Sequence, residues 1–169
     1  MTTPAAQADP TISAAFISQS LYLLREEYLP KIERCLEQLT DEQVWWRANE
    51  SSNSIGNLIL HLSGNARQWI VSGLGGEPDE RKRDAEFAER RMVPRDELLD
   101  HLRRAVSDFD RTLESFDIGQ LLDEFQIQGT MTTALSAIFH VTEHFSMHVG
   151  QILYITKQLT ADDLHFYDL

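Results

Sequence analysis

His140-Val141-Thr142-Glu143-His144-Phe145-Ser146-Met147-His148-Val149-Gly150-Gln151 is the stretch around which the chain is organised. It places three histidines at intervals of four in a run that otherwise has the pattern of a buried helix. At about 100° per residue, His140, His144 and His148 form one ridge, and Gln151 falls on it too. Buried imidazole nitrogens need bonding partners. The ridge therefore predicts that other groups bond to the nitrogens of these rings.

Apolar residues surround most of this helix, which we expect to run from about Met131 or Thr132 to Leu159, roughly 40 Å. A helix with so little polar face is the one that its neighbours enclose most. Between Asp117 and Thr130 the chain has partial alternation of apolar and polar residues and ends in a glycine. A short extended excursion or hairpin is expected there.

Three other segments have the apolar spacing of three and four residues that is typical of amphipathic helices. They span residues 11–39, 55–70 and 94–116. Pro30 predicts a kink near Glu26–Pro30, or a break into two helices. Together these patterns predict an all-α fold, a four-helix bundle with a long connection between helices 2 and 3. We expect one domain over residues 11–169, preceded by a flexible N-terminal tail over residues 1–10.

Composition excludes several classes of partner. The 169-residue chain has 15 Lys and Arg against 27 Asp and Glu, a formal charge of −12. Such a surface repels nucleic acid and anionic lipid. Cys35 is the lone cysteine, which suits a reducing compartment, and neither a signal peptide nor a membrane span is recognisable. We expect a cytoplasmic protein that binds neither nucleic acid nor membranes.

Helical bundles build metal sites from side chains on facing helices. The pair His144 and His148, at i and i+4, has the spacing that directs two imidazoles to one ion. His61 is the best candidate for a third ligand because it lies in the middle of the second helix, whereas His101 lies off the apolar stripe of the third. Three neutral imidazoles leave open positions on a divalent ion, as in catalytic sites. The alternative is a set of core or surface histidines without a metal.

Two sequence motifs carry a family resemblance. Asn53-Ser-Ile-Gly-Asn-Leu-Ile-Leu-His61 and His144-Phe-Ser-Met-His148-Val-Gly-Gln151-Ile resemble the DinB-like family of four-helix bundles, in particular its DUF1572 branch. The resemblance covers nearly the whole chain. It implies that His61, His144 and His148 bind a divalent metal, often zinc or nickel, and it also implies a homodimer. Many relatives have a histidine or arginine near the final ligand where this chain has Met147 and Val149, so that role does not carry over.

Other residues near the ridge have open roles. His140 is a candidate fourth ligand, supporting hydrogen-bond donor or substrate contact, or else a core histidine bonded to a backbone carbonyl. Gln151 and Asn57 are candidates for orienting the ligand imidazoles, with ordinary interhelical hydrogen bonding as the alternative. No catalytic base is assigned, since Glu143 lies about 100° from His144.

Two glycines near the histidines, and the charged connection after the second helix, each allow two interpretations. Gly64, one turn after His61, and Gly150, beside His148, indicate either room for a ligand or a close helix crossing. The charged connection at residues 77–93 is expected to be a solvated face, with contact to an anionic substrate as the alternative.

The first functional hypothesis is a metal-dependent enzyme that activates a thiol or water toward a small-molecule substrate. The family resemblance implies a thiol-dependent transferase with a small cellular thiol as cosubstrate. The second hypothesis is a non-catalytic bundle that binds a metal or small molecule.

Overall fold

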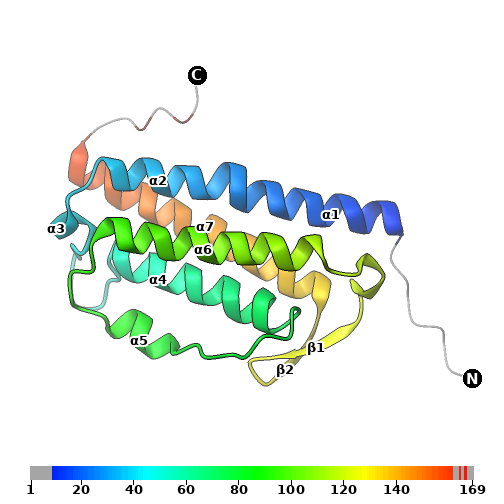
Figure 1. Ribbon diagram of the computed structural model, residues 1–169. Coiled ribbons are helices and arrows are strands. Elements are labelled where there is room, and N and C mark those ends of the chain that lie inside the picture. The colour runs from blue at the N-terminus through cyan, green and yellow to red at the C-terminus, as the bar shows by residue number, and fades with distance from the viewer. Residues whose placement is uncertain (1–8, 162–163, 165, 167–169) are drawn as a thin grey trace, which may run out of the picture.

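The computed structural model describes residues 9–161, 164 and 166. Its first rod consists of α1 (Pro10–Tyr22), the π-helical segment η1 (Leu23–Tyr28) and α2 (Leu29–Glu37). The Asp9 side chain caps this rod, so helix begins at Pro10, inside the range expected to be a tail. The other residues of that expected tail, 1–8, lie outside the described residues. The irregularity expected near Pro30 takes the form of η1, where the Leu29 N–H donates to the Leu24 carbonyl, and α1 and α2 stay in line (Figure 1).

The remaining helices follow in chain order. They are α3 (Asp41–Val44), α4 (Ile55–Ala66), the π-helical segment η2 (Arg67–Ser72), α5 (Arg83–Ala88), α6 (Arg95–Glu114), the 3₁₀ turn η3 (Ile118–Gln120) and α7 (Ala134–Thr160). Capping boxes begin two of them: Thr40 and Gln43 cap α3, and Ser54 and Asn57 cap α4. These reciprocal bonds satisfy backbone N–H groups that a helix start leaves unpaired.

A two-stranded antiparallel hairpin, β1 (Glu124–Ile127) and β2 (Thr130–Thr133), precedes α7. Gln128 and Gly129, both with positive φ, form its two-residue turn. The expected hairpin is therefore present, but the expected start of the last helix at Met131 or Thr132 is wrong. Those residues belong to β2, and the Thr133 side chain caps α7 by accepting from Ser136 N.

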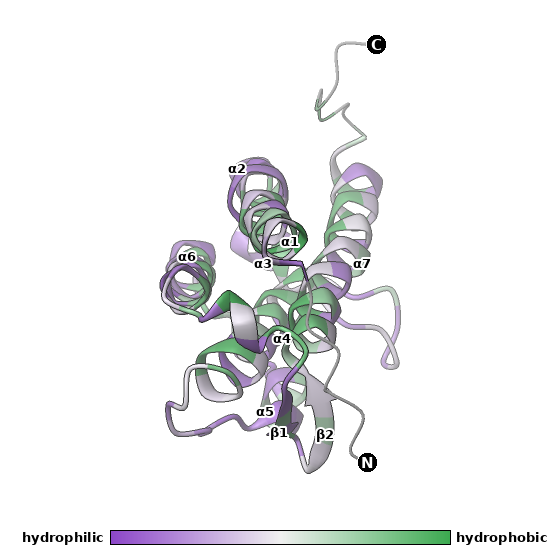
Figure 2. Cartoon of the chain, turned by 90° about the vertical axis from the view of Figure 1, so that its right-hand side faces the viewer, coloured by the Kyte–Doolittle hydropathy of each residue, from purple (hydrophilic) through white to green (hydrophobic). Residues whose placement is uncertain are grey.

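Four rods surround the core, as the view along the bundle shows (Figure 2). The α1–α2 rod lies opposite α4, and α6 and α7 lie between them on either side, with their apolar faces turned inward. Phe109 of α6 and Phe145 of α7 are among the largest fully buried side chains. The fold is an all-α bundle with one small hairpin.

The direction of the rods explains the long connection. α4 and α6 run the same way, so the chain between them must return along the bundle, and α5 lies on the outer side of α4 (Figure 1). Near the end of the described residues, Leu164 is buried and Phe166 packs against the core. Among the described residues, no helix is both long and apolar enough to cross a membrane.

Candidate metal centre

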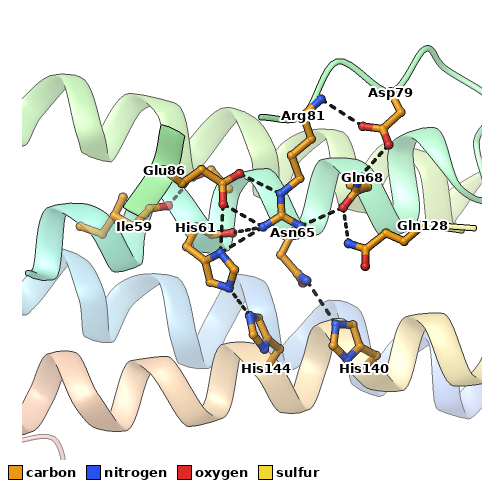
Figure 3. A network of polar contacts seen from close by, with 11 residues as sticks. Ile59, His61, Asn65, Gln68, Asp79, Arg81, Glu86, Gln128, His140 and His144 are labelled. Atoms are coloured by element: carbon orange, nitrogen blue, oxygen red, sulfur yellow. Dashed lines mark hydrogen bonds and ion pairs between the residues drawn. The ribbon is translucent and has the colours of Figure 1, made fainter. Parts of the chain in front are cut away.

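Three histidines from two facing rods meet in the bundle. One ring nitrogen each from His61 of α4 and from His144 and His148 of α7 lie within 4.8 Å of one another. His61 Nε2 and His144 Nε2 are 2.8 Å apart, and Figure 3 shows these two rings pointing toward each other across the helices. His61 and His148 are buried, whereas His144 is half-buried. The fold thus brings together the three residues that the sequence singled out as ligands.

Two of the rings are held from behind by oxygen atoms. His148 Nδ1 lies 2.7 Å from Gln151 Oε1, and His61 Nδ1 lies 2.9 Å from Glu86 Oε2. An amide oxygen accepts hydrogen bonds, so Nδ1 of His148 carries the hydrogen and its Nε2 keeps the lone pair. His61 Nδ1 lies near both an acceptor, Glu86 Oε2, and a donor, Arg81 Nη2, which is 3.0 Å away. With its hydrogen directed at the carboxylate, His61 keeps the lone pair on Nε2 as well. Metal-binding histidines have this arrangement, in which a second group fixes the tautomer and the ring orientation. The donor set therefore fits a divalent ion.

Burial keeps two of the three rings, His144 and His148, in the neutral form that can bind a metal. It lowers the pKa of His144 to about 3, with the charges of His148 and His61 acting in the same direction. Burial also lowers the pKa of His148, against an opposing hydrogen bond to Gln151. Neutral imidazole is the ligating form. At neutral pH these two rings are therefore in the neutral form that metal binding requires.

An ion pair from the connection, Arg81 with Glu86, packs behind His61. Arg81 Nε donates to Glu86 Oε1 at 2.7 Å, and Arg81 Nη2 donates to Glu86 Oε2 at 2.9 Å. The two side chains are 4% and 11% exposed. Burial acts to raise the pKa of Glu86, but hydrogen bonds from Arg81 and His61 outweigh it and hold this pKa below the usual value. Glu86 is thus a carboxylate partner of His61.

The expectation that residues 77–93 form only a solvated face is wrong for this pair. Lys82, Arg83 and Asp84 are exposed as expected, but Arg81 and Glu86 turn inward. The sequence did not predict these two residues because Arg81 and Glu86 follow His61 by 20 and 25 residues. No sequence motif has that spacing. A buried histidine that binds a metal usually donates its other N–H to a carboxylate or carbonyl, and this rule could have prompted a search for such a partner in the connection.

The two glycines singled out earlier have different environments. A Cβ on Gly64 would overlap the Glu86 carboxylate and approach Arg81 Nε. The space at Gly64 is therefore filled by the ion pair, not by a ligand or a crossing helix. At Gly150 a Cβ would meet nothing within 4 Å. This open space contradicts a close helix crossing at Gly150, and room for a ligand there stays a prediction.

Asn57 forms hydrogen bonds with the connection and, among the described residues, with no imidazole. Its Nδ2 donates to the backbone carbonyls of Glu86 and Glu89, at 2.8 and 3.1 Å. Its Oδ1 accepts from Ser54 at the start of α4. Asn57 therefore anchors the peptide that carries Glu86, the hydrogen-bond partner of His61.

His140 lies beside the cluster and is not part of it. Its Nε2 is 3.2 Å from Asn65 Nδ2, and its ring lies against Trp69 with centroids 4.2 Å apart. The alternative of a hydrogen bond from His140 to a backbone carbonyl is therefore wrong, since the hydrogen-bond partner of His140 is the Asn65 side chain. On α6, His101 is exposed at the surface, as its place off the apolar stripe predicts.

Comparisons with known proteins identify the family and support the fold. The sequence model of a family described as "Protein of unknown function (DUF1572)" matches residues 11–168. Among curated proteins, none matches the chain. A crystal structure of a DinB-like protein from Bacillus cereus ATCC 10987 is similar, with 18% identity, a TM-score of 0.66 and coverage of 86% of this chain and 91% of that one. A conserved protein from Enterococcus faecalis has 16% identity, a TM-score of 0.65 and coverage of 93% and 100%. At these identities the likeness concerns the fold.

Proposed function

The chain belongs to the DUF1572 family, and on that premise we propose that it is a metal-dependent enzyme whose ion is held by His61, His144 and His148. The observation that carries this proposal is the pairing of each buried ligand ring with an oxygen acceptor at Nδ1, Gln151 for His148 and Glu86 for His61. A core histidine needs one partner per polar nitrogen. Here the second nitrogen of each ring turns toward other imidazoles, which is an arrangement that suits an ion between them.

We propose zinc or nickel as the ion. Imidazole nitrogens suit both metals, and the cluster lacks the all-oxygen set that calcium and magnesium prefer. Three neutral ligands leave positions on a four- to six-coordinate ion for a substrate or water. His144 is half-buried, which supports access from that side.

A bound divalent ion would lower the pKa of a thiol or water and supply a nucleophile at neutral pH. The chain's own residues set the conditions for this chemistry. Glu86 and Gln151 fix two ligand rings, and the apolar bundle excludes bulk water from their buried side. We propose thiol transfer to an electrophilic small molecule, in which the sulfur forms a bond to carbon, a leaving group departs and the thiol proton goes to solvent. Hydrolysis is the alternative within the same site.

Metal binding is tested first. Protein purified without chelator is analysed for metals, and zinc and nickel affinities are measured by competition with a chromophoric chelator. His61→Ala, His144→Ala and His148→Ala should each abolish tight binding and the thermal stabilisation that a bound metal gives. His101→Ala, at an exposed position, is the matched control. Equal metal binding by the control and the three variants would contradict the site.

Activity is tested on the loaded protein with several cellular thiols and an electrophile such as 1-chloro-2,4-dinitrobenzene. Metal-dependent consumption of thiol, absent in His148→Ala, supports the transferase proposal. Tight metal binding without turnover of any thiol or ester would favour the non-catalytic alternative.

A further inference from the structure

Two buried polar atoms close to the centre have no hydrogen-bond partner among the described residues. They are Asn65 Oδ1 and Trp69 Nε1, and Asn65 as a whole is 3% exposed. Most buried polar atoms in proteins are paired, so an unpaired one needs an explanation, such as a ligand group. Both side chains contact the same ring, since Asn65 Nδ2 lies 3.2 Å from His140 Nε2 and Trp69 packs on that imidazole.

His140 connects these atoms to the proposed metal centre. Its ring is stacked on that of His144, with centroids 5.2 Å apart and an interplanar angle of 29°. Figure 3 shows Asn65 pointing from α4 toward His140, one helical turn along α7 from His144. Trp69 lies in the π-helical segment η2, and π turns occur frequently at functional sites. The side chains that carry the unpaired atoms therefore contact His140, and His140 in turn stacks on a proposed ligand.

The chemistry of the two atoms defines what they can bind. An indole N–H only donates, and an amide oxygen only accepts. A group that satisfies both must itself accept and donate, as a hydroxyl or a carboxamide does. The charged side chains that act on His140 include Glu143 and Arg81, and the Arg81 guanidinium is already paired with Glu86. This environment favours an uncharged group over a carboxylate.

We propose that Asn65 and Trp69, with His140 between them, form a subsite for an uncharged hydroxyl or carboxamide group of the substrate. The reacting end of the same molecule lies at the metal, so this inference rests on the proposed metal-dependent function. The subsite gives His140 a role that is separate from ligation. It also names the substrate class: a neutral polar molecule whose hydroxyl or amide lies a few bonds from its metal-binding atom.

Three matched thiols test the subsite: 3-mercaptopropionamide, 3-mercaptopropionate and propane-1-thiol. In the cobalt-loaded protein, visible absorption reports metal occupancy and the sulfur-to-cobalt band reports thiol binding. We expect the amide to bind about tenfold more tightly than propane-1-thiol because of the two added hydrogen bonds. The carboxylate should gain no such advantage. Asn65→Leu and Trp69→Phe should each reduce the amide's advantage severalfold and leave the affinity for propane-1-thiol unchanged, which shows that the centre is intact.

A second readout is independent of sulfur binding. In the zinc-treated protein labelled with ¹⁵N, the indole N–H of Trp69 should shift on addition of the amide, while Trp46→Phe should leave that response unchanged. No Trp69 shift, preferred binding of the carboxylate, or an amide advantage that persists in both subsite variants would overturn the proposal. Absence of cobalt and zinc binding would refute the metal function, and the indole signal would still decide the subsite.

Discussion

Glu86 Oε2 lies 2.9 Å from His61 Nδ1, although α5, which carries the carboxylate, belongs to the connection and the histidine to a core helix. The contact joins the crossover to the proposed metal centre. A carboxylate in this position fixes the tautomer of a ligand histidine and raises its basicity. In the proposed metal centre, the connection contributes to metal affinity without supplying a ligand.

Gly64→Ala tests this contribution sterically. The added methyl group would occupy the position of the Glu86 carboxylate, so Glu86 must move away from His61. We expect zinc affinity to fall about 10- to 100-fold, the usual effect of losing a partner behind a metal ligand. Competition with a chromophoric chelator measures this change. Gly150→Ala is the matched control, because its methyl group meets no atom within 4 Å, and an equal loss in both variants would argue against the Glu86 contact as the cause.

Arg81→Leu tests the ion pair as a stabilising element. The substitution leaves the Glu86 carboxylate, 11% exposed, without its cationic partner, and breaking a buried pair in this way costs about 3–5 kcal/mol. Urea denaturation measures the free energy of unfolding. Adding Glu86→Gln to Arg81→Leu should recover part of the loss because the unpaired charge is then gone. Lys82→Leu, at an exposed neighbouring position, should change stability by less than about 0.5 kcal/mol; a similar cost there would show that burial of the pair is not what matters.

The periodicity of apolar residues was sufficient to predict the bundle. Spacings of three and four give each rod one buried stripe, and long stripes of this kind have few alternative structures. The start of α7 could not be placed in the same way. Met131 and Thr132 continue the pattern of the helix, but the turn at Gln128 and Gly129 pairs them with β1 instead.

The three clustered histidines were predictable because two of them share a helix ridge and the third is central in a facing helix. Arg81 and Glu86 were not, since charged residues in a connection are usually solvated and only the return path of the crossover brings these two to His61. The pairing of Asn65 with His140 depends on the packing of α4 against α7, which sequence spacing within either helix does not specify.

Cys35 provides a test of the core rather than of the centre. Its thiol is buried, and burial raises its pKa to about 11 despite a hydrogen bond involving Thr156. Thiolate is the reactive form of cysteine, so the folded protein should not react with iodoacetamide or a disulfide reagent at pH 8. Mass spectrometry should find modification only after denaturation. Rapid labelling of native protein would mean that the α2–α7 contact opens readily.

Asp110 of α6 predicts how stability depends on pH. Its side chain is 13% exposed, and its nearest cation, Arg25 Nη1, lies 3.9 Å away. Burial raises the pKa of Asp110 from 3.8 to about 6, while Arg25 opposes the shift. Between these two values the folded state binds the proton more tightly than the unfolded chain does. The contribution of Asp110 to stability is therefore fully present below pH 3.8 and is lost as the pH rises to about 6.

Asp110→Asn should remove this loss, because an amide does not ionise. We expect the variant to gain about 1–3 kcal/mol relative to the parent between pH 4 and pH 7, measured as the difference in their free energies of unfolding in urea at each pH. The variant also loses the ion pair with Arg25, which makes the gain in the free energy of unfolding smaller. The gain should still increase as the pH rises. Asp100→Asn, an exposed carboxylate on the same helix, should give a difference that is nearly flat with pH. A difference for Asp110→Asn that is equally flat would mean that this carboxylate ionises as it does in the unfolded chain.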